Sequence, residues 1–474
     1  MMCDIPEAVA DLAGPLPIEN EIAAAAKPER RLVIHSRWMV AIAGTVMMMC
    51  LGTVYSWSLF ARPLIAAFAW SSTTTMWAFS TAIFALGVGA VCGGRLQDRF
   101  GPRNIALAGV VLWAIGNVLA GVLTPRFGAT ALYLSYGVVG GFGLGMGYVS
   151  PVAMVTKWFP DHRGFASGLV LTGFGLGAFF YNAIVPLYAP FALAAKDASN
   201  YLATGAPLSA GDVQAIMTVF MWSGVAYLGI GGLCALLLRD PPAGFGRRVN
   251  DPPKAEGRQF TPCEVLRTPQ FYMLWLMLFC SVTAGILVIS NAVPIFSDLT
   301  GATAAFAAPV VGLLAVFNGI GRVLWGHASD RIGRNTAFTL ILGIQAVVFA
   351  LMPILHSTLF VGIAFGIVLL CNGGSFGTMP AFNADYFGTK YMGLNYGMII
   401  TAWGFAGVAG PLLAARVKDM TGSFEGTLLP LALMLLLATI IPMVASKPGH
   451  SSRVVDVLRR RIVRSAIAPE REAA

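Results

Sequence analysis

Twelve long apolar runs, separated by mostly short polar segments, dominate this chain of 474 residues. A helix of about 20 apolar residues crosses the roughly 30 Å hydrocarbon layer of a bilayer, so each run is a candidate membrane span. A membrane β-barrel would instead show segments of about ten residues with alternating polarity. The sequence therefore predicts an all-α membrane protein with twelve spans, at 38–61, 74–94, 105–124, 131–156, 164–189, 215–238, 270–296, 305–326, 336–355, 359–382, 392–415 and 427–446.

The composition excludes several other classes of protein. Hydrophobic residues make up 57% of the chain and charged residues 11%, whereas soluble domains average roughly 45–50% and about 25%. The seven cysteines show no CxxC or CxxH spacing, which argues against a disulfide scaffold or a metal site. The sequence has no evident Ser-His-Asp set and no HExxH motif. We therefore expect a protein that is not an enzyme and that uses neither a metal nor a cofactor.

The distribution of basic residues predicts the orientation in the membrane. With both termini inside, the inside segments carry 25 Lys and Arg residues and the outside loops carry five. Such an excess marks the cytoplasmic side of a multi-pass protein. The first run is too long for the apolar core of a signal peptide. We expect a multi-pass protein of the cytoplasmic (inner) membrane with both termini cytoplasmic, whose net charge of +9 faces anionic lipid and not nucleic acid.

Internal repeats divide the chain into halves. Two loop motifs share Gly, Asp, Arg and Gly at an offset of 232 residues, about half the chain. A second pair of segments, beginning at Pro151 and Pro380, aligns at an offset of 229. These offsets predict two six-helix halves of the same orientation, an arrangement found in one class of transporters. The expected domains are a cytoplasmic tail at 1–36, a six-helix half at 37–238, a cytoplasmic linker at 239–269, a second six-helix half at 270–446 and a cytoplasmic tail at 447–474.

The loop motifs are candidates for a conformational gate. Their glycines let two helices approach closely, and an Asp at a helix end accepts hydrogen bonds from a neighbouring helix N-terminus or pairs with an Arg. Such a contact holds one conformation and is released in the other. A generic basic loop is the alternative, which two matched copies disfavour. The candidate gating residues are Gly94, Asp98, Arg99, Gly101, Arg103, Gly326, Asp330, Arg331, Gly333 and Arg334.

The two loops resemble the sequence motif of the major facilitator superfamily. Other segments resemble its oxalate–formate exchanger and monocarboxylate transporter branch, namely 52–60, Trp158-Phe159-Pro160 with Arg163-Gly164, Asn318 with Arg322, and Asn395-Tyr396-Gly397. The resemblance covers about residues 36–446. It implies the twelve-helix fold of that superfamily and a secondary transporter of small organic anions, in which the two halves alternate access to a central site.

Arg322 is the ionisable residue that lies inside an apolar run instead of at its end. It precedes Asp330 by eight residues, roughly 12 Å along a helix, which places it within the hydrocarbon layer. A charge at this depth is costly and marks a functional site by default, although its long side chain has the alternative of snorkelling to the interface. A guanidinium matches a carboxylate in shape and charge. The resemblance likewise implies that an Arg at this place binds the substrate carboxylate.

The eleventh run bears on the charge of the substrate. The oxalate exchanger of the resembled branch has a Lys here, whereas this run contains no cation and places Trp403 near the matching position. One buried cation suits one carboxylate, so we expect a monocarboxylate such as formate, lactate or pyruvate and not oxalate. Tyr55, Tyr148 and Asn318 are expected to line the cavity with Arg322 and Trp403; core packing and interhelical hydrogen bonding are the alternatives. Further candidates are Trp57, Asn291 and Asn372.

The expected function is alternating-access transport of a small carboxylate by a single chain within the lipid bilayer. Anion exchange is favoured over proton symport because no Asp or Glu lies within an apolar core. A permanently charged, empty Arg322 site would also be costly to return across the membrane. Proton-coupled monocarboxylate symport and oxalate/formate antiport remain alternatives. A membrane sensor is a remote alternative, because a sensor would need a sizeable output domain and the two tails and the linker are each too short to form one.

Overall fold

The computed structural model describes residues 37–205, 208–242, 245, 258–302, 304–421 and 425–448. Every regular element in these residues is a helix, and no strand is present among them. Eight helical segments of this part are long and apolar enough to cross a membrane. One of them, Pro102–Trp158, covers two predicted runs and breaks at Gly128, where φ is 67° and ψ is −152°. The predicted all-α membrane fold is thus confirmed.

A first group of helices contains the six N-terminal predicted runs. It begins with the span Arg37–Phe68, which passes the expected end at residue 61 by two turns of helix. The named elements of this group are η2 (Thr53–Ser56), α2 (Trp57–Phe68), α3 (Ser72–Phe100), α4 (Pro102–Leu132), η3 (Tyr133–Gly140), α5 (Gly141–Trp158), α6 (Arg163–Ile184), η4 (Val185–Leu187), α7 (Ala189–Thr204), α8 (Ala210–Ala226), η5 (Tyr227–Gly231) and α9 (Gly232–Leu237).

A second group contains the six C-terminal predicted runs. The runs at 305–326 and 392–415 lie in α12 and α15, and the run at 427–446 is divided between two shorter helices. The elements are α11 (Pro269–Thr300), α12 (Ala304–Ile332), α13 (Arg334–Leu351), η6 (Met352–Ile354), α14 (Thr358–Phe387), α15 (Met392–Thr421), η7 (Glu425–Thr427), α16 (Leu428–Ala438) and α17 (Ile440–Val444).

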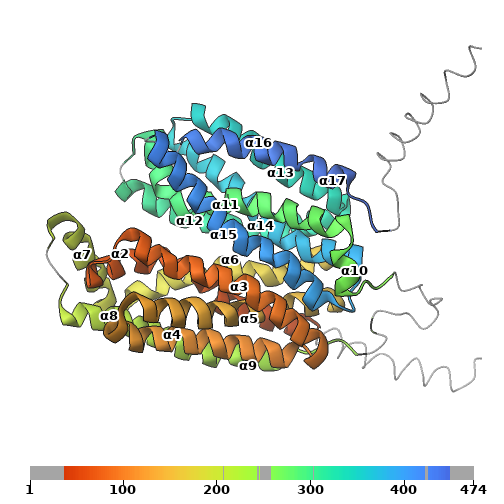
Figure 1. Cartoon of the computed structure of the whole chain (residues 1–474), viewed down its shortest axis with the longest axis horizontal. Helices are drawn as coiled ribbons and strands as arrows, with labels where there is room; N and C mark the ends of the chain where they lie inside the picture. Colours follow the sequence, from red (N-terminus) through yellow and green to blue (C-terminus); the bar gives the residue numbers. More distant parts are fainter. Residues whose placement is uncertain are drawn as a thin grey trace, which may run out of the picture.

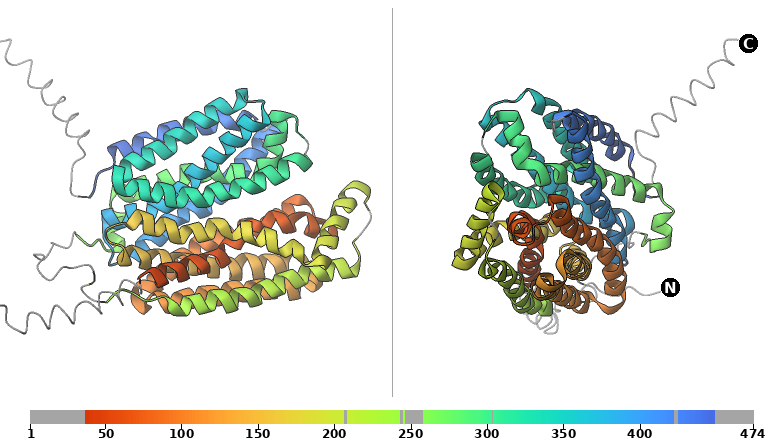
Figure 2. Two further views of the ribbon diagram at one scale, coloured as in Figure 1. Left: turned by 180° about the vertical axis from the view of Figure 1, so that it is seen from behind. Right: turned by 60° about the vertical axis from the view of Figure 1, so that its left-hand side comes forward.

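The two groups lie side by side with their long helices running in similar directions (Figures 1 and 2). Across the boundary, α6 packs along α12 and α3 packs along α15. Glycines permit this close approach, since a Cβ at Gly168 would collide with the Arg322 carbonyl and one at Gly397 with the Ala90 carbonyl. The helices that precede the two loop motifs, α3 and α12, therefore both lie at the boundary.

The segment at 190–214, which the sequence suggests is a long loop, contains the helix α7. Its apolar side chains Phe191, Ala194 and Ala198 are buried and recur at helical spacing. Phe191 packs against Phe60 of α2 with ring centroids 5.7 Å apart. The polar residues between them break the apolar run, which is why hydropathy alone did not reveal this helix.

The described end of the linker docks on the turn between α14 and α15. α10 (Pro262–Leu266) starts with a capping box, in which Thr261 and Glu264 each bond the backbone N–H of the other. Hydrogen bonds from the Thr261 backbone, Arg258 and the Thr261 hydroxyl lower the pKa of Glu264 to about 2. Phe260 donates its N–H to the Phe387 carbonyl at 2.9 Å. Most of the predicted linker, 239–269, precedes this end and lies partly outside the described residues.

Candidate functional site

Arg322 has no exposed surface and lies between α6 and α14. Both helices approach the backbone of α12 so closely at Arg322 that only glycine fits at the contact. A Cβ at Gly168 of α6 or at Gly377 of α14 would collide with the Arg322 carbonyl. Thr172 of α6 strengthens the contact by donating its hydroxyl to the Gly319 carbonyl at 2.9 Å. The backbone of α12 is thus held between α6 and α14 at Arg322. The guanidinium does not snorkel to an exposed interface, because its side chain is wholly buried.

One edge of the guanidinium is held and the other is free. Nε and Nη2 of Arg322 each donate to Oδ1 of Asn318 at 3.3 Å. Asn318 is in turn held by the bond from its Nδ2 to the Leu369 carbonyl at 3.4 Å. Nη1 of Arg322 is buried and has no hydrogen-bond partner in the part of the chain that the structure describes. Among the described residues no carboxylate forms an ion pair with Arg322.

Five aromatic rings from five helical elements surround this charge, and we call them the aromatic cage: Tyr55, Tyr148, Phe174, Phe376 and Trp403. Phe376 and Phe174 lie 5.0 Å and 5.5 Å from the Arg322 Cζ, measured to the ring centroids. Trp403 contacts each of the other four rings, with centroid separations of 4.9 to 6.0 Å. Such rings stabilise a desolvated cation through their faces and exclude water from it.

Two hydrogen-bond donors of the site lack partners among the described residues. They are Arg322 Nη1 and the indole Nε1 of Trp403, and both are buried. The Tyr148 hydroxyl lies close to the Tyr396 hydroxyl and to the Arg322 side chain. Buried polar groups without partners cost roughly 1–3 kcal/mol each. A cation with an unused donor and no carboxylate paired with it among the described residues is suited to bind an anion.

The structure brings together all five residues that the sequence selected for binding, namely Arg322, Tyr55, Tyr148, Trp403 and Asn318. It adds Phe174, Phe376 and Tyr396. Two other candidates lie apart: Trp57 packs on Tyr136 at 5.0 Å, and Asn372 packs against Gly285 of α11. The side chain of Asn291 lies outside the described residues.

Asp98 of the first loop motif binds the start of α15, in the other group of helices. Its carboxylate oxygens accept the N–H groups of Gly393 and Leu394 at 3.0 and 2.9 Å. We call this contact the first latch. Gly94, one turn earlier, makes room for it, because a Cβ there would collide with the Gly393 carbonyl. Gly101 ends the helix with φ of +82°.

Asp330 of the second motif makes the reciprocal contact with the start of α6. Its oxygens accept the N–H groups of Gly164 and Phe165 at 2.9 and 2.8 Å, and we call this contact the second latch. A Cβ at Gly326 would collide with the Gly164 carbonyl. Both latches are formed, so the two groups of helices are closed against each other at the end that carries the loop motifs. Gly333 repeats the positive φ of Gly101, at +87°.

An ion-pair network surrounds the second latch. Arg334 pairs with Asp330 at 2.7 Å and with Asp385 of α14 at 2.9 Å. Asp385 also pairs with Arg163 of α6 at 2.8 Å. Its Arg163–Asp385 pair joins the two groups of helices, whereas both pairs of Arg334 lie within the second group. The remaining basic residues of the motifs, Arg99, Arg103 and Arg331, are exposed, and the first of them packs over Phe100.

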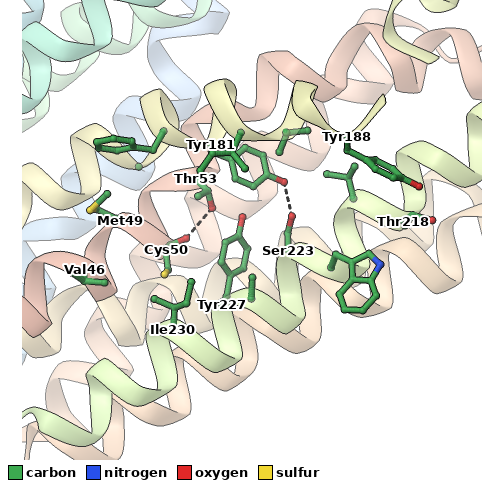
Figure 3. A pocket seen from close by; sticks show the side chains of 17 residues that line it. Val46, Met49, Cys50, Thr53, Tyr181, Tyr188, Thr218, Ser223, Tyr227 and Ile230 are labelled. Carbon is green, nitrogen blue, oxygen red and sulfur yellow. Dashed lines mark hydrogen bonds between the residues drawn. The ribbon is translucent and has the colours of Figure 1, made fainter. Parts of the chain in front are cut away.

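A separate cavity of about 660 Å³ lies between the first span, α6 and α8 (Figure 3). No residue of the aromatic cage lines it. Its Tyr181 and Ser223 hydroxyls are bonded to each other at 2.6 Å, and exposed apolar residues such as Trp222 border it. It contains no charged side chain, so the Arg322 site is the better candidate for an anion.

Known proteins resemble this chain along most of its length. Residues 40–411 match the model of the Major Facilitator Superfamily. The oxalate:formate antiporter of Oxalobacter formigenes is 30% identical over 400 residues, covering 82% of this chain and 87% of that protein. Apicoplast pyruvate carrier 1 of Toxoplasma gondii is 24% identical, with 82% and 85% covered.

Monocarboxylate transporter 13 of Bos taurus is 25% identical, with 82% and 84% covered. Among solved structures, the E. coli fucose:proton symporter FucP gives a TM-score of 0.64 at 17% identity, covering 85% of this chain and 97% of that one. The proton:xylose symporter XylE gives 0.66 at 14%, with 86% and 95% covered. These proteins are named as transporters or carriers, and the family model spans well over half of the chain. The protein therefore belongs to the major facilitator superfamily of transporters.

Proposed function

We propose that this protein transports small monocarboxylates by alternating access, with Arg322 as the anchor of the substrate carboxylate. The observation that carries the proposal is the free Nη1 edge of a wholly buried guanidinium inside an aromatic cage. The named substrates of the relatives, oxalate and formate, pyruvate and monocarboxylates, are all small carboxylates. Tyr55, Tyr148 and Asn318 orient the anion and the guanidinium, and Trp403 closes the cage.

The gating motifs fit the same cycle. Each latch joins a loop-motif Asp of one group of helices to a helix start of the other. Release of both latches opens the motif end, and their formation closes it. The positive-inside distribution supports a cytoplasmic location for this end and for both termini, in a cytoplasmic (inner) membrane. A single chain contains the whole binding site, which supports function as a monomer.

The experiment that tests the proposal is uptake of labelled formate, lactate, pyruvate and oxalate into proteoliposomes containing the purified protein. Arg322→Gln removes the charge and should abolish uptake, whereas Arg322→Lys keeps the charge without the planar fork and should lower uptake severely. Arg126→Gln, a change in an expected outside loop, is the matched control and should transport normally. Wild-type uptake by a folded Arg322→Gln protein would contradict the proposal.

We favour anion exchange over proton symport. Asp98, Asp330 and Asp385, three carboxylates at the ends of spans, are engaged in the latches or in the ion-pair network. The empty site keeps the charge of Arg322, because Arg is not deprotonated in proteins. Internal monocarboxylate should therefore accelerate uptake many-fold, and an acid-outside gradient alone should not. Strong accumulation in empty vesicles under that gradient would establish proton symport instead.

A further inference from the structure

Trp403 and Arg322 face the same two phenyl rings. Phe376 lies 5.0 Å from the Arg322 Cζ and 4.9 Å from the Trp403 ring centroid, and Phe174 lies 5.5 Å from each. The guanidinium and the indole are thus at most about 10 Å apart, with a phenyl ring on either flank. This spacing limits a molecule bound between them to a very short one.

The two groups offer different chemistry to such a molecule. Arg322 is a permanent cation with a free edge, while the indole N–H of Trp403 is a neutral donor that cannot accept a hydrogen bond. Trp403 is wholly buried and its Nε1 has no partner among the described residues. The carboxylate of formate or acetate pairs with the guanidinium and leaves the indole donor unsatisfied. The site is therefore complete only with a substrate that carries an additional acceptor.

That additional acceptor is neutral. A second carboxylate would be buried against Trp403 with no cation beside it among the described residues, and an unpaired buried charge is far costlier than an unpaired dipole. A carbonyl or hydroxyl oxygen matches one N–H donor without this cost. In a molecule short enough for the cage, this oxygen lies on the carbon next to the carboxylate.

We propose that Trp403 is a specificity-determining residue, which selects short 2-oxo or 2-hydroxy monocarboxylates by donating its indole N–H to the C2 oxygen while Arg322 binds the carboxylate. The inference rests on the proposed carboxylate transport and extends it. Trp403 then acts against two kinds of competitor. Unsubstituted acids leave its N–H unpaired, and dicarboxylates bring a charge that it cannot neutralise.

Competition in proteoliposomes tests the inference. Unlabelled pyruvate, lactate, propionate and oxalate compete with labelled pyruvate for uptake, propionate being the three-carbon acid without a C2 oxygen. In the wild type, pyruvate and lactate should compete about tenfold better than propionate, and oxalate should compete no better than propionate. Trp403→Phe keeps an aromatic ring but loses the donor, so the preference for pyruvate over propionate should fall to near unity while propionate competes as before.

Trp325→Phe is the matched control. Trp325 is another buried indole, but it packs with Ala337, Ile341 and Cys371 outside the cage, so its substitution should leave the preference unchanged. Equal competition by pyruvate and propionate in the wild type would overturn the inference even if Trp403→Phe failed to fold. So would an unchanged preference in Trp403→Phe, or oxalate competing as well as pyruvate. Those outcomes leave Arg322 as anchor, whereas absence of any monocarboxylate uptake defeats the proposed function itself.

Discussion

The first latch holds the start of α15 through two backbone N–H groups, whereas the second latch adds an ion-pair network to the same kind of contact. The shared part is the motif itself: an Asp that caps a helix of the other group, and a glycine that lets the two helices touch. Lys157 and Asp240 form an ion pair near the first latch, but both are partly exposed and neither bonds Asp98 in the structure.

The repeat offsets explain why only one latch is reinforced. At the offset of 232, Arg334 corresponds to Pro102, which cannot pair with a carboxylate. At the offset of 229, Asp385 corresponds to Thr156 and Arg163 to Met392. The corresponding positions of the first copy therefore carry no charged residue, whereas the helix cap is present in both copies. Under the proposed alternating access, we infer that the second latch supplies most of the electrostatic free energy that holds the motif end closed.

The largest expected effect comes from the feature that both latches share. Gly94→Val or Gly326→Val would drive a side chain into a carbonyl of the facing helix. Overpacking of this kind costs roughly 1–3 kcal/mol, so the ratio of closed to open forms at the motif end should fall by about 5- to 150-fold. Thiol labelling of a cysteine placed at buried Ser167, in a background without native cysteines, measures this ratio. An equal fall of the ratio for both variants would show that the two latches depend on the same close contact. A fall for one variant alone would show that they do not.

The second effect concerns the network alone. Arg163→Gln removes the ion pair with Asp385 that joins α6 to α14 across the two groups, while both ion pairs of Arg334 remain. Partly buried ion pairs of this kind contribute about 2 kcal/mol when one partner is removed, which corresponds to a shift of about 30-fold toward the open form in the same labelling assay. Arg103→Gln is the matched control, since Arg103 belongs to the first motif and is exposed. Equal shifts in the two variants would show that the network has no special role.

Much of the fold follows from the sequence because a bilayer requires long apolar helices. The spans, the family and the two-fold repeat of the motif were predictable on this ground. The helix α7 was not, since its buried stripe of Phe191, Ala194 and Ala198 is interrupted by polar residues. The break at Gly128 falls between the predicted runs at 105–124 and 131–156, where Pro125 and Arg126 interrupt the apolar sequence.

The binding site was predictable where its chemistry is unusual for a membrane. Arg322 stands out as a charge in an apolar run, and Trp403 as an aromatic residue in a run that contains no cation. Phe174 and Phe376 carry no such signal, because a phenyl ring in an apolar run is the ordinary case. Tyr396 belongs to a segment that resembles the family, yet nothing in its spacing places it beside Tyr148. The pairing of Arg163 with Asp385 joins residues 222 positions apart, which only the packing of α6 on α14 establishes.

The third effect is smaller and concerns the first latch. Asp98→Asn keeps one acceptor for the N-terminus of α15 but loses the charge that favours a helix N-terminus. The loss of about 1 kcal/mol should shift the closed-to-open ratio by about fivefold, with substrate affinity little changed. Asp330→Asn should shift it by a similar amount, because the pair of Asp330 with Arg334 lies within one group and is present in both forms. If Asp98→Asn changes neither the labelling nor the transport rate, the first motif has no gating role and serves only as a basic loop that sets the orientation in the membrane.

The smallest effect on this ratio, and the sharpest control, is expected at the turns that follow the two latches. Gly101 and Gly333 have φ of +82° and +87° with ψ of +163° and +153°, a region that side chains strongly disfavour, while a Cβ at either would meet nothing within 4 Å.

Substitution by Ala therefore adds backbone strain of about 1–3 kcal/mol and no collision. Each turn joins two helices of the same group, so it moves with them as one body and is equally strained in both forms. Gly101→Ala and Gly333→Ala should lower the thermal unfolding temperature by similar amounts and leave the labelling ratio unchanged. A shift in the ratio for one of them would show that its turn deforms during the transition, and that this latch is a hinge as well as a contact.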